Sequence, residues 1–200
     1  MPGSIEAKDL IGTLVQHHVA ITSTLPVFEG AAGGGRPPIR QQALEAMTPE
    51  AREDFFLLRQ RPASRQAPKA DPAMLFKRDM ELEHAFAAAG GLLIAGPDPT
   101  GVGDVLPGFG DQREIELLVE AGFSPVEAIK IATLNGAKYL GRENQIGTVA
   151  TGKNADLVVI KGDPSKKISD VENVEIVFKD GVGYDAGKLL ESVRGRYGQY

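Results

Sequence analysis

One aspartate stands where a parallel sheet would present it for chemistry. Asp98 follows the short apolar segment 92–95 and lies between Pro97 and Pro99 in a glycine-rich loop. In parallel α/β folds, catalytic groups gather at the carboxyl ends of the strands. The two prolines restrict the backbone, so the carboxylate is placed to bind a divalent metal ion or to take a proton from a metal-bound water. The alternative is a structural role as a cap or turn residue, which is common for Asp in such loops.

The histidines do not form a metal-binding motif. His17 and His18 precede the apolar segment 19–25, at the amino end of a strand, where parallel folds do not carry catalysis. Adjacent strand residues point to opposite faces, so we expect one of this pair to be packed and the other solvated. His84 lies three residues after Glu81, which favours a surface ion pair. A catalytic zinc needs three protein ligands, and neither H-x-H nor H-E-x-x-H occurs.

Other polar residues are weaker candidates. Ser23 and Thr24 end the first apolar segment and could touch a ligand, but no G-x-S-x-G motif surrounds them. The glycines at 30–35 lack the G-x-x-x-x-G-K-[ST] pattern of a phosphate-binding loop, so we interpret them as a mobile lid or insertion. Arg113 and Glu114 begin a predicted helix beside the Asp98 loop, where they could line a pocket or simply face solvent.

Helices and two apolar strands must position these groups. N-caps predict helices that begin after Ser4, Thr48, Asp71, Asp111 and Ser124. Strands are predicted over 19–25 and 92–95, loops over 30–38 and 62–68, and helix ends near 61, 90, 121 and 140. Strands that are apolar along their whole length indicate a parallel sheet covered on both faces.

The hydrophobic pattern then changes to a period of about two residues. Short strands are predicted over 146–149, 155–160 and 174–179, with a tight hairpin at Asp180–Gly181 and a tail over 186–200 that forms a short helix and a loose end. The chain therefore reads as βα units followed by a small β unit.

Composition excludes several classes. The 200 residues are 42% hydrophobic and 24% charged, which is ordinary for a globular protein and not for a disordered chain or a rod. The formal charge of −5 argues against nucleic acid as a partner, and no apolar run approaches the ~20 residues of a membrane helix. There is no cysteine for a disulfide or thiolate site. Residues 1–4 show no signal-peptide pattern, and a cytoplasmic location is favoured.

Three ordered segments resemble the amidohydrolase superfamily. Residues 93–101 (LIAGPDPTG) resemble the last barrel strand and its metal-site aspartate. Residues 122–129 and 132–137 (GFSPVEAI and ATLNGA) resemble a helix stretch of these enzymes, and 147–159 (GTVATGKNADLVV) resembles their return into a small β domain. The nearest branch is the imidazolonepropionase-like one, which includes dipeptidases that cleave Xaa-Pro or Xaa-Arg bonds.

The resemblance implies a (β/α)8 barrel with one or two divalent metal ions, usually zinc. The ligands of the family are an H-x-H after the first strand, often a carboxylated Lys after the fourth, His after the fifth and sixth, and Asp after the eighth. The last of these corresponds to Asp98, which would bind the metal and accept a proton from the attacking water. Segments 19–25 and 92–95 would be strands seven and eight, and His17 and His18 match no ligand position.

The sequence departs from the family pattern in two ways. Pro97 stands where many relatives have Thr, and the first six strands with their ligands are absent. A barrel takes ~250 residues. We therefore predict an α/β fold that is a partial (β/α)8 TIM barrel, with the last two strands and helices in residues 1–141. A small β unit of a composite β-sandwich domain follows in 142–185, and a tail in 186–200.

These expectations support three functional hypotheses. The first is the C-terminal portion of a metal-dependent amidohydrolase that hydrolyses a C–N bond of a small molecule or dipeptide, is inactive by itself and lacks its N-terminal half. The second is a non-catalytic assembly module or truncated pseudoenzyme, because two barrel strands would expose open edges. The third is a hydrolase completed by pairing in a homo-oligomer, which is disfavoured because two copies would still lack the histidine ligands.

Overall fold

The computed structural model describes residues 3–32, 39–60, 71–99 and 105–198. The predicted loop at 62–68, most of the glycine-rich loop at 30–38 and residues 100–104 of the Asp98 loop lie outside these ranges. None of the helices in the described ranges is both long and apolar enough to cross a membrane.

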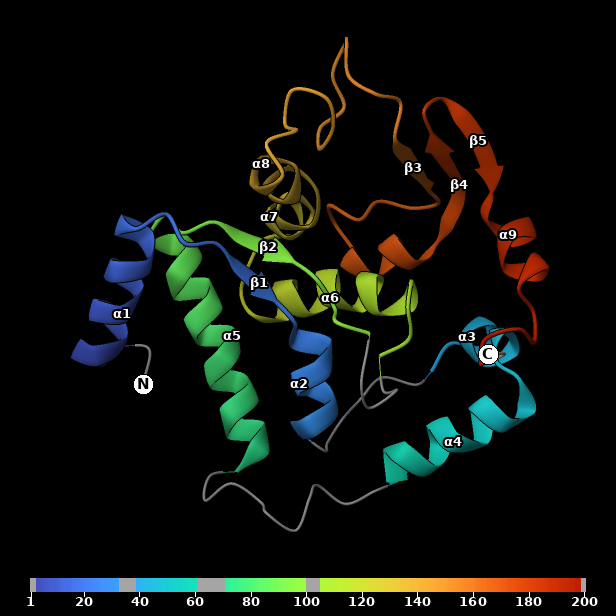
Figure 1. Cartoon of the computed structure of the whole chain (residues 1–200), viewed down its shortest axis with the longest axis horizontal. Helices are drawn as coiled ribbons and strands as arrows, with labels where there is room; N and C mark the ends of the chain where they lie inside the picture. The colour runs from blue at the N-terminus through green and yellow to red at the C-terminus, as the bar shows by residue number, and fades with distance from the viewer. Residues whose placement is uncertain (1–2, 33–38, 61–70, 100–104, 199–200) are drawn as a thin grey trace.

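A pair of parallel strands forms the centre of the first part of the chain. Strand β1 (Ile21–Ser23) pairs with β2 (Leu93–Ala95), and Ile21 lies opposite Leu93 while Ser23 lies opposite Ala95. Figure 1 shows the two strands side by side near the middle of the molecule, with α5 and α2 below them, α7 and α8 above and α1 at the left-hand end. The predicted adjacency of the two apolar strands is confirmed, and both strands are shorter than predicted.

Helices cover these strands. They are α1 (Ile5–Gln16), α2 (Leu25–Ala32), α5 (Pro72–Ala88), α6 (Phe109–Glu120), α7 (Pro125–Lys130), a π-helical turn (Ile131–Asn135) and α8 (Gly136–Tyr139). Leu25, Phe86, Leu93, Leu117 and Leu118, which are at most 1% exposed, lie in the core that these elements share. The burial of large apolar side chains is the main force that holds such helices on a sheet.

Local capping explains where most of the helices begin. The Ser4 hydroxyl accepts a hydrogen bond from Ala7 N at 3.3 Å, and Asp71 accepts one from Ala73 N at 3.1 Å. Ser124 and Glu127 form the predicted reciprocal capping box. The prediction for Asp111 was wrong by one turn. Helix α6 begins at Phe109, and Asp111 accepts a hydrogen bond from Gly108 N at 3.0 Å from within the first turn.

Two further predictions need correction near the first strand. The strand predicted over 19–25 ends at Ser23, because Leu25 already begins α2 and is fully buried. Helix α2 runs to Ala32, so residues 30–32 are helical rather than part of a loop. Apolar side chains that pack on α5 and α6 therefore override the local signal of the glycines.

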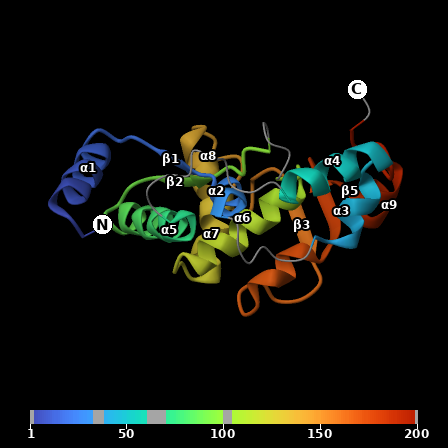
Figure 2. The same cartoon turned by 90° about the horizontal axis from the view of Figure 1, so that it is seen from below.

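The C-terminal part contains an antiparallel sheet with the order β3–β4–β5. The strands are β3 (Leu157–Ile160), β4 (Val174–Lys179) and β5 (Val182–Asp185), and a 3-10 helix (Ile168–Glu172) joins β3 to β4. The predicted hairpin at Asp180–Gly181 is confirmed, with φ values of +50° and +82° at the two residues. Figure 2 shows this sheet at the opposite end of the molecule from α1.

The strand predicted over 146–149 does not form. The Lys153 ammonium group donates to the carbonyl oxygen of Glu143 and to that of Ile146, and the latter would otherwise pair with a neighbouring strand. Gly147 adopts a φ of +88°, and a Cβ there would lie 2.6 Å from Ala137 Cβ. The segment therefore turns back against α8 instead of extending.

The remaining helices lie beside the C-terminal tail. Helices α3 (Gln41–Ala46), α4 (Pro49–Gln60) and α9 (Ala186–Ser192) meet there. Tyr197 N donates to Ala46 O at 2.9 Å, and Thr48 N donates to Tyr197 O at 2.9 Å. The tail predicted as a loose end is therefore bonded to the α3–α4 junction as far as Tyr197.

The part of the predicted barrel that the structure confirms is a mixed α/β unit with two adjacent parallel strands. A small antiparallel sheet follows it, as expected. Within the described ranges the parallel strands do not close into a barrel. The boundaries predicted at 141 and 185 stay predictions.

Candidate functional site

The two parallel strands end together, and their ends begin the candidate site. Gly96 N donates a hydrogen bond to Ser23 O at 3.0 Å, which joins the residue after β2 to the last residue of β1. A Cβ at position 96 would lie 2.7 Å from Thr22 Cγ2. Glycine at position 96 therefore lets this segment approach β1 closely, just before the loop that carries Asp98.

Asp98 lies two residues after Gly96, on the side where sequence analysis placed it. Its side chain is exposed to solvent, and its φ of +45° is in the left-handed region, which Asp tolerates better than most residues. Pro97 lies against the first turn of α6, because a Cβ at Gly110 would be 3.4 Å from Pro97 Cβ. The loop thus presents a carboxylate at the carboxyl end of β2, in a conformation that is uncommon for non-glycine residues.

A metal ion of the kind that the family resemblance implies is not accommodated by the described residues alone. Among residues 3–32, 39–60, 71–99 and 105–198, no three His, Cys, Asp or Glu side chains are grouped so that they could hold an ion. Asp98 is one carboxylate donor, whereas a catalytic zinc takes three protein ligands. Its role as metal ligand and catalytic residue stays a prediction.

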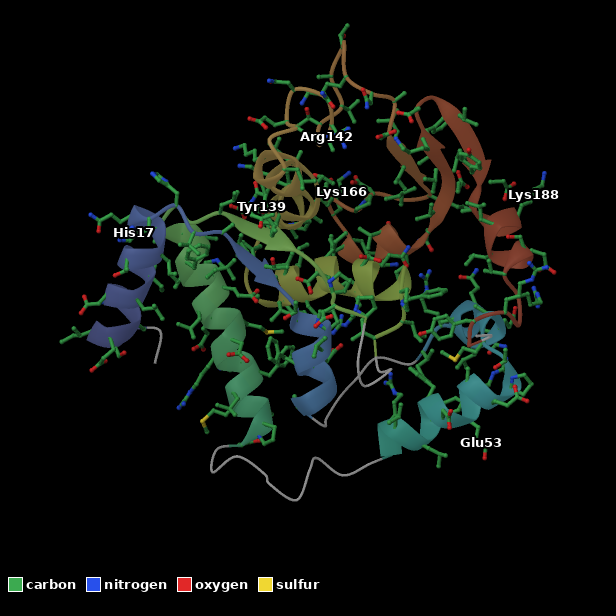
Figure 3. All side chains as sticks on the ribbon, in the orientation of Figure 1. His17, Glu53, Tyr139, Arg142, Lys166 and Lys188 are labelled. Atoms are coloured by element: carbon green, nitrogen blue, oxygen red, sulfur yellow. The ribbon has the colours of Figure 1, made fainter. Side chains whose placement is uncertain are left out.

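Among the described residues, the three histidines are not grouped with Asp98 in a set of side chains that could hold a metal ion. His17 and His18 are both exposed at the end of α1, so the expectation that one of them is packed was wrong. Figure 3 shows His17 at this end of the molecule. The predicted ion pair of His84 with Glu81 is not made. The His84 ring instead contacts the Phe123 ring, with 4.8 Å between the centroids.

A second group of polar side chains lies behind the end of β1. Ser23 and Glu114 are fully buried, and the Ser23 hydroxyl donates to Glu83 Oε2 at 2.7 Å. Neither carboxylate oxygen of Glu114 completes a hydrogen bond, although the Ser23 hydroxyl and the Leu25 N–H lie near it. We call Ser23, Glu83 and Glu114 the buried acid cluster. It joins β1, α5 and α6.

Burial governs the electrostatics of this cluster. It raises the pKa of Glu83 to about 7, and the negative charges of Glu114 and Asp79 act in the same direction. It also raises the pKa of Glu114 to about 7, and there the Ser23 hydroxyl and the Leu25 backbone act against it. A carboxylate that leaves water without a cation is destabilised, so the neutral form is favoured.

Ser23 and Glu114 are candidates from the sequence alone, whereas their association with Glu83 was not predicted. Of the two alternatives for Glu114, the one in which it faces solvent was wrong, because its side chain is buried. One signal could have shown this: Leu117 and Leu118 lie three and four residues after Glu114, so the acid occupies the apolar stripe of α6. Glu83 carries no comparable signal, because its partner Ser23 is 60 residues away.

Arg113 does line a cavity, as one of the alternatives for it proposed. The cavity is about 120 Å³ and lies between α2, α3, α4 and α6. The Arg113 guanidinium bonds Glu29 at 2.6 Å, Glu116 at 3.0 Å and Glu120 at 2.8 Å. The Arg113 charge is therefore shared among these three carboxylates.

Comparisons with known proteins agree with the motifs. The amidohydrolase family model matches residues 98–183. An imidazolonepropionase from Parabacteroides distasonis is 30% identical over 112 residues, which are 52% of this chain and 27% of that protein. An adenine deaminase from Methanococcoides burtonii is 34% identical over 89 residues, which are 44% of this chain and 13% of that protein.

A solved structure supports the fold. The crystal structure of a Xaa-Pro dipeptidase with bound methionine in the active site superposes with a TM-score of 0.58 at 23% identity. The superposition covers 92% of this chain and 38% of that one. Over residues 98–183 the chain is therefore similar to the amidohydrolase family, and it spans less than a third of the length of these two curated relatives.

Proposed function

We propose that this chain is the part of a metal-dependent amidohydrolase that supplies Asp98 as metal ligand and proton acceptor. The complete enzyme would hydrolyse a C–N bond of a small molecule or dipeptide. The observation that carries the proposal is the place of Asp98, which follows β2 at the carboxyl end of a parallel strand pair. The family match begins at the same residue, and relatives include an imidazolonepropionase, an adenine deaminase and a Xaa-Pro dipeptidase fold.

A divalent metal ion, zinc by resemblance, belongs to this proposal for the complete enzyme. Such an ion polarises a carbonyl group and lowers the pKa of bound water. The described residues offer it one carboxylate. We therefore propose that the 200-residue chain by itself does not turn over substrate, and that the other ligands come from a segment or chain that completes the fold.

The test compares the chain with a completed enzyme. The 200-residue chain and a fusion to the N-terminal barrel portion of an imidazolonepropionase are assayed with added Zn²⁺. The substrates are Xaa-Pro and Xaa-Arg dipeptides, a cyclic amide and adenine. We expect hydrolysis by the fusion and none by the chain alone. Metal-dependent hydrolysis by the chain alone would overturn the claim of inactivity. A folded fusion that binds zinc but hydrolyses none of these substrates would count against the proposed amidohydrolase function.

A non-catalytic assembly module is the second candidate, and the outer edge of β2 favours it. Leu92 and Gly96 bond to β1, so the backbone groups of Leu93 and Ala95 point away from β1. The Asn135 side-chain amide donates to the Leu93 carbonyl oxygen at 2.8 Å. The backbone groups of Ala95 face the same outer edge, where a further strand could pair with them. Size-exclusion chromatography with X-ray scattering would reveal association through this edge, whereas a compact monomer would count against it.

A further inference from the structure

The buried acid cluster contains two carboxyl groups, Glu83 and Glu114, and a neutral hydroxyl group. Glu83 and Glu114 come from different helices, and the hydroxyl of Ser23 lies between them. Within the described residues neither acid makes an ion pair with Lys or Arg, and the guanidinium nearest in sequence, that of Arg113, is bound to three other carboxylates. Two carboxylates that share a site without a cation cannot both ionise cheaply.

The single hydroxyl hydrogen of Ser23 indicates which of the two acids, Glu83 or Glu114, is protonated. A serine hydroxyl has one hydrogen and two lone pairs, and Ser23 donates its hydrogen to Glu83 Oε2 at 2.7 Å. Ser23 can therefore bond Glu114 only by accepting, and Glu114 can donate only when it is protonated. Both oxygens of the fully buried Glu114 lack a hydrogen-bond partner, so no donor stabilises its ionised form and the neutral acid is favoured.

We propose that the buried acid cluster is a proton-binding site, in which a protonated Glu114 donates to Ser23 Oγ and Ser23 donates to an ionised Glu83. The Leu25 N–H, at the start of α2, also lies near the Glu114 carboxyl group. The bound proton thus joins β1, α2, α5 and α6. The inference does not depend on the activity proposed for Asp98.

The other charged groups around the cluster favour retention of this proton. Asp79 on α5 acts on Glu83, and Asp111 on α6 acts on Glu114, and both carry negative charge. Helix α2 contributes the Leu25 N–H, and its own acid, Glu29, is bound to Arg113 at 2.6 Å. Strand β1 contributes the neutral Ser23 hydroxyl.

The cluster also contacts the segment that leads to Asp98. The same residue that carries the hydroxyl, Ser23, accepts the Gly96 N–H through its backbone carbonyl at 3.0 Å. Loss of the proton would place two charges behind this residue. We therefore expect the Gly96 amide to sense the protonation of Glu114.

The direction of the pH effect follows from linkage. The pKa of Glu114 in the folded chain is raised to about 7 from an ordinary 4.5. The folded chain therefore holds a proton that the unfolded chain has lost between these values. Its stabilising contribution is complete below pH 4.5, declines as pH rises and is gone above about 7. Over this window the unfolding equilibrium constant rises by at most about tenfold per pH unit.

The experiment is a carboxyl-carbon NMR titration of the 200-residue chain labelled with ¹³C in its glutamates, with signals assigned through Glu83→Gln and Glu114→Gln. Burial raises the pKa of both acids, and two acids that share a site release their protons in two steps. We expect the step near 7 to fall on Glu114, Glu83 to release its proton at lower pH because Ser23 donates to it, and the Gly96 amide shift to follow the midpoint of Glu114. Ordinary midpoints near 4.3 for both acids, or a high midpoint on Glu83 instead, would overturn the proposal. A metal ion found at the site by elemental analysis would also overturn it.

A stability measurement supplies a second readout. Urea unfolding is followed from pH 5 to pH 8 for the original chain, for Glu114→Gln and for Glu81→Gln, an exposed acid on the same helix as Glu83. The original chain and Glu81→Gln should lose stability together as pH rises. Glu114→Gln should remove most of this slope, because its amide supplies the hydrogen permanently. An unchanged slope in Glu114→Gln would contradict the proposal even if the NMR signals overlap.

Discussion

Two carboxylates near the end of the same strand pair have opposite surroundings. Asp98 is exposed in a proline-flanked loop with a left-handed backbone. Glu114 is fully buried among Ser23, Glu83 and the start of α2. Solvent can bring a metal ion or a substrate to the first, whereas the second can exchange little more than a proton. The same functional group is thus suited to a catalytic role in one place and to a structural, pH-dependent role in the other.

Ser23 connects these two regions. Its backbone carbonyl accepts from Gly96 N at 3.0 Å, and its hydroxyl donates to Glu83 at 2.7 Å. A change in the Asp98 loop should therefore alter activity and leave the free energy of unfolding nearly unchanged. A change in the cluster should alter stability first. The following variants test this distinction, from the largest expected effect to the smallest.

Asp98→Asn should lower turnover of a completed enzyme by roughly a hundredfold or more, because a proton acceptor is lost. Asn tolerates the left-handed backbone at this position, so the free energy of unfolding should change by no more than about 0.5 kcal/mol. Steady-state kinetics and urea unfolding check the two expectations. Asp180→Asn is the matched control, since Asp180 has a similar φ of +50° in the distant hairpin. Retained turnover in Asp98→Asn would remove Asp98 from the mechanism.

Ser23→Ala should destabilise the folded chain by about 1–3 kcal/mol, because it leaves Glu83 buried without its donor. The Ser23 hydrogen bond lowers the pKa of Glu83, so its loss penalises the ionised form and should cost more as pH rises. Urea unfolding at pH 6 and pH 8 measures this dependence. Ser192→Ala, which removes an exposed hydroxyl, serves as control. If Ser23→Ala lowers the free energy of unfolding equally at both pH values, the Ser23 hydroxyl does not stabilise the charge of Glu83.

Gly96→Ala should cost about 1–2 kcal/mol, because the new Cβ would crowd Thr22 Cγ2. This position lies between the two regions, so the variant should affect stability and, in a completed enzyme, turnover. The double variant Thr22→Ser/Gly96→Ala removes the crowding methyl group and should recover most of both. If the double variant is no better than Gly96→Ala alone, contact with Thr22 is not the reason for glycine at this position.

Ser124→Ala should destabilise the chain by about 1 kcal/mol through loss of an N-cap, with no effect on the titration of Glu114. The capping box that it breaks lies at the start of α7, outside both regions. Urea unfolding and the carboxyl-carbon titration measure the two quantities. A shifted midpoint for Glu114 in this variant would show that the cluster responds to general loosening rather than to its own hydrogen bonds.

Much of the architecture was predictable because its signals are local. Ser4, Asp71 and Ser124 each bond the backbone within three residues, so the starts of their helices follow from neighbouring residues alone. The hairpin at Asp180 has the same local origin. The strand predicted over 146–149 does not form because the Ile146 carbonyl accepts from Lys153 and Gly147 lies close to Ala137, neither of which the hydrophobic periodicity indicates.

The sequence by itself determined that an aspartate follows an apolar strand and that the surrounding motifs resemble the amidohydrolases. These features depend on the order of residues within short segments. Only the tertiary structure decided which carboxylate is buried and which is exposed. Ser23 on β1 and Glu83 on α5 are 60 residues apart and meet only in the folded chain. Burial is a property of that packing, and it separates the environment of Glu114 from that of Asp98.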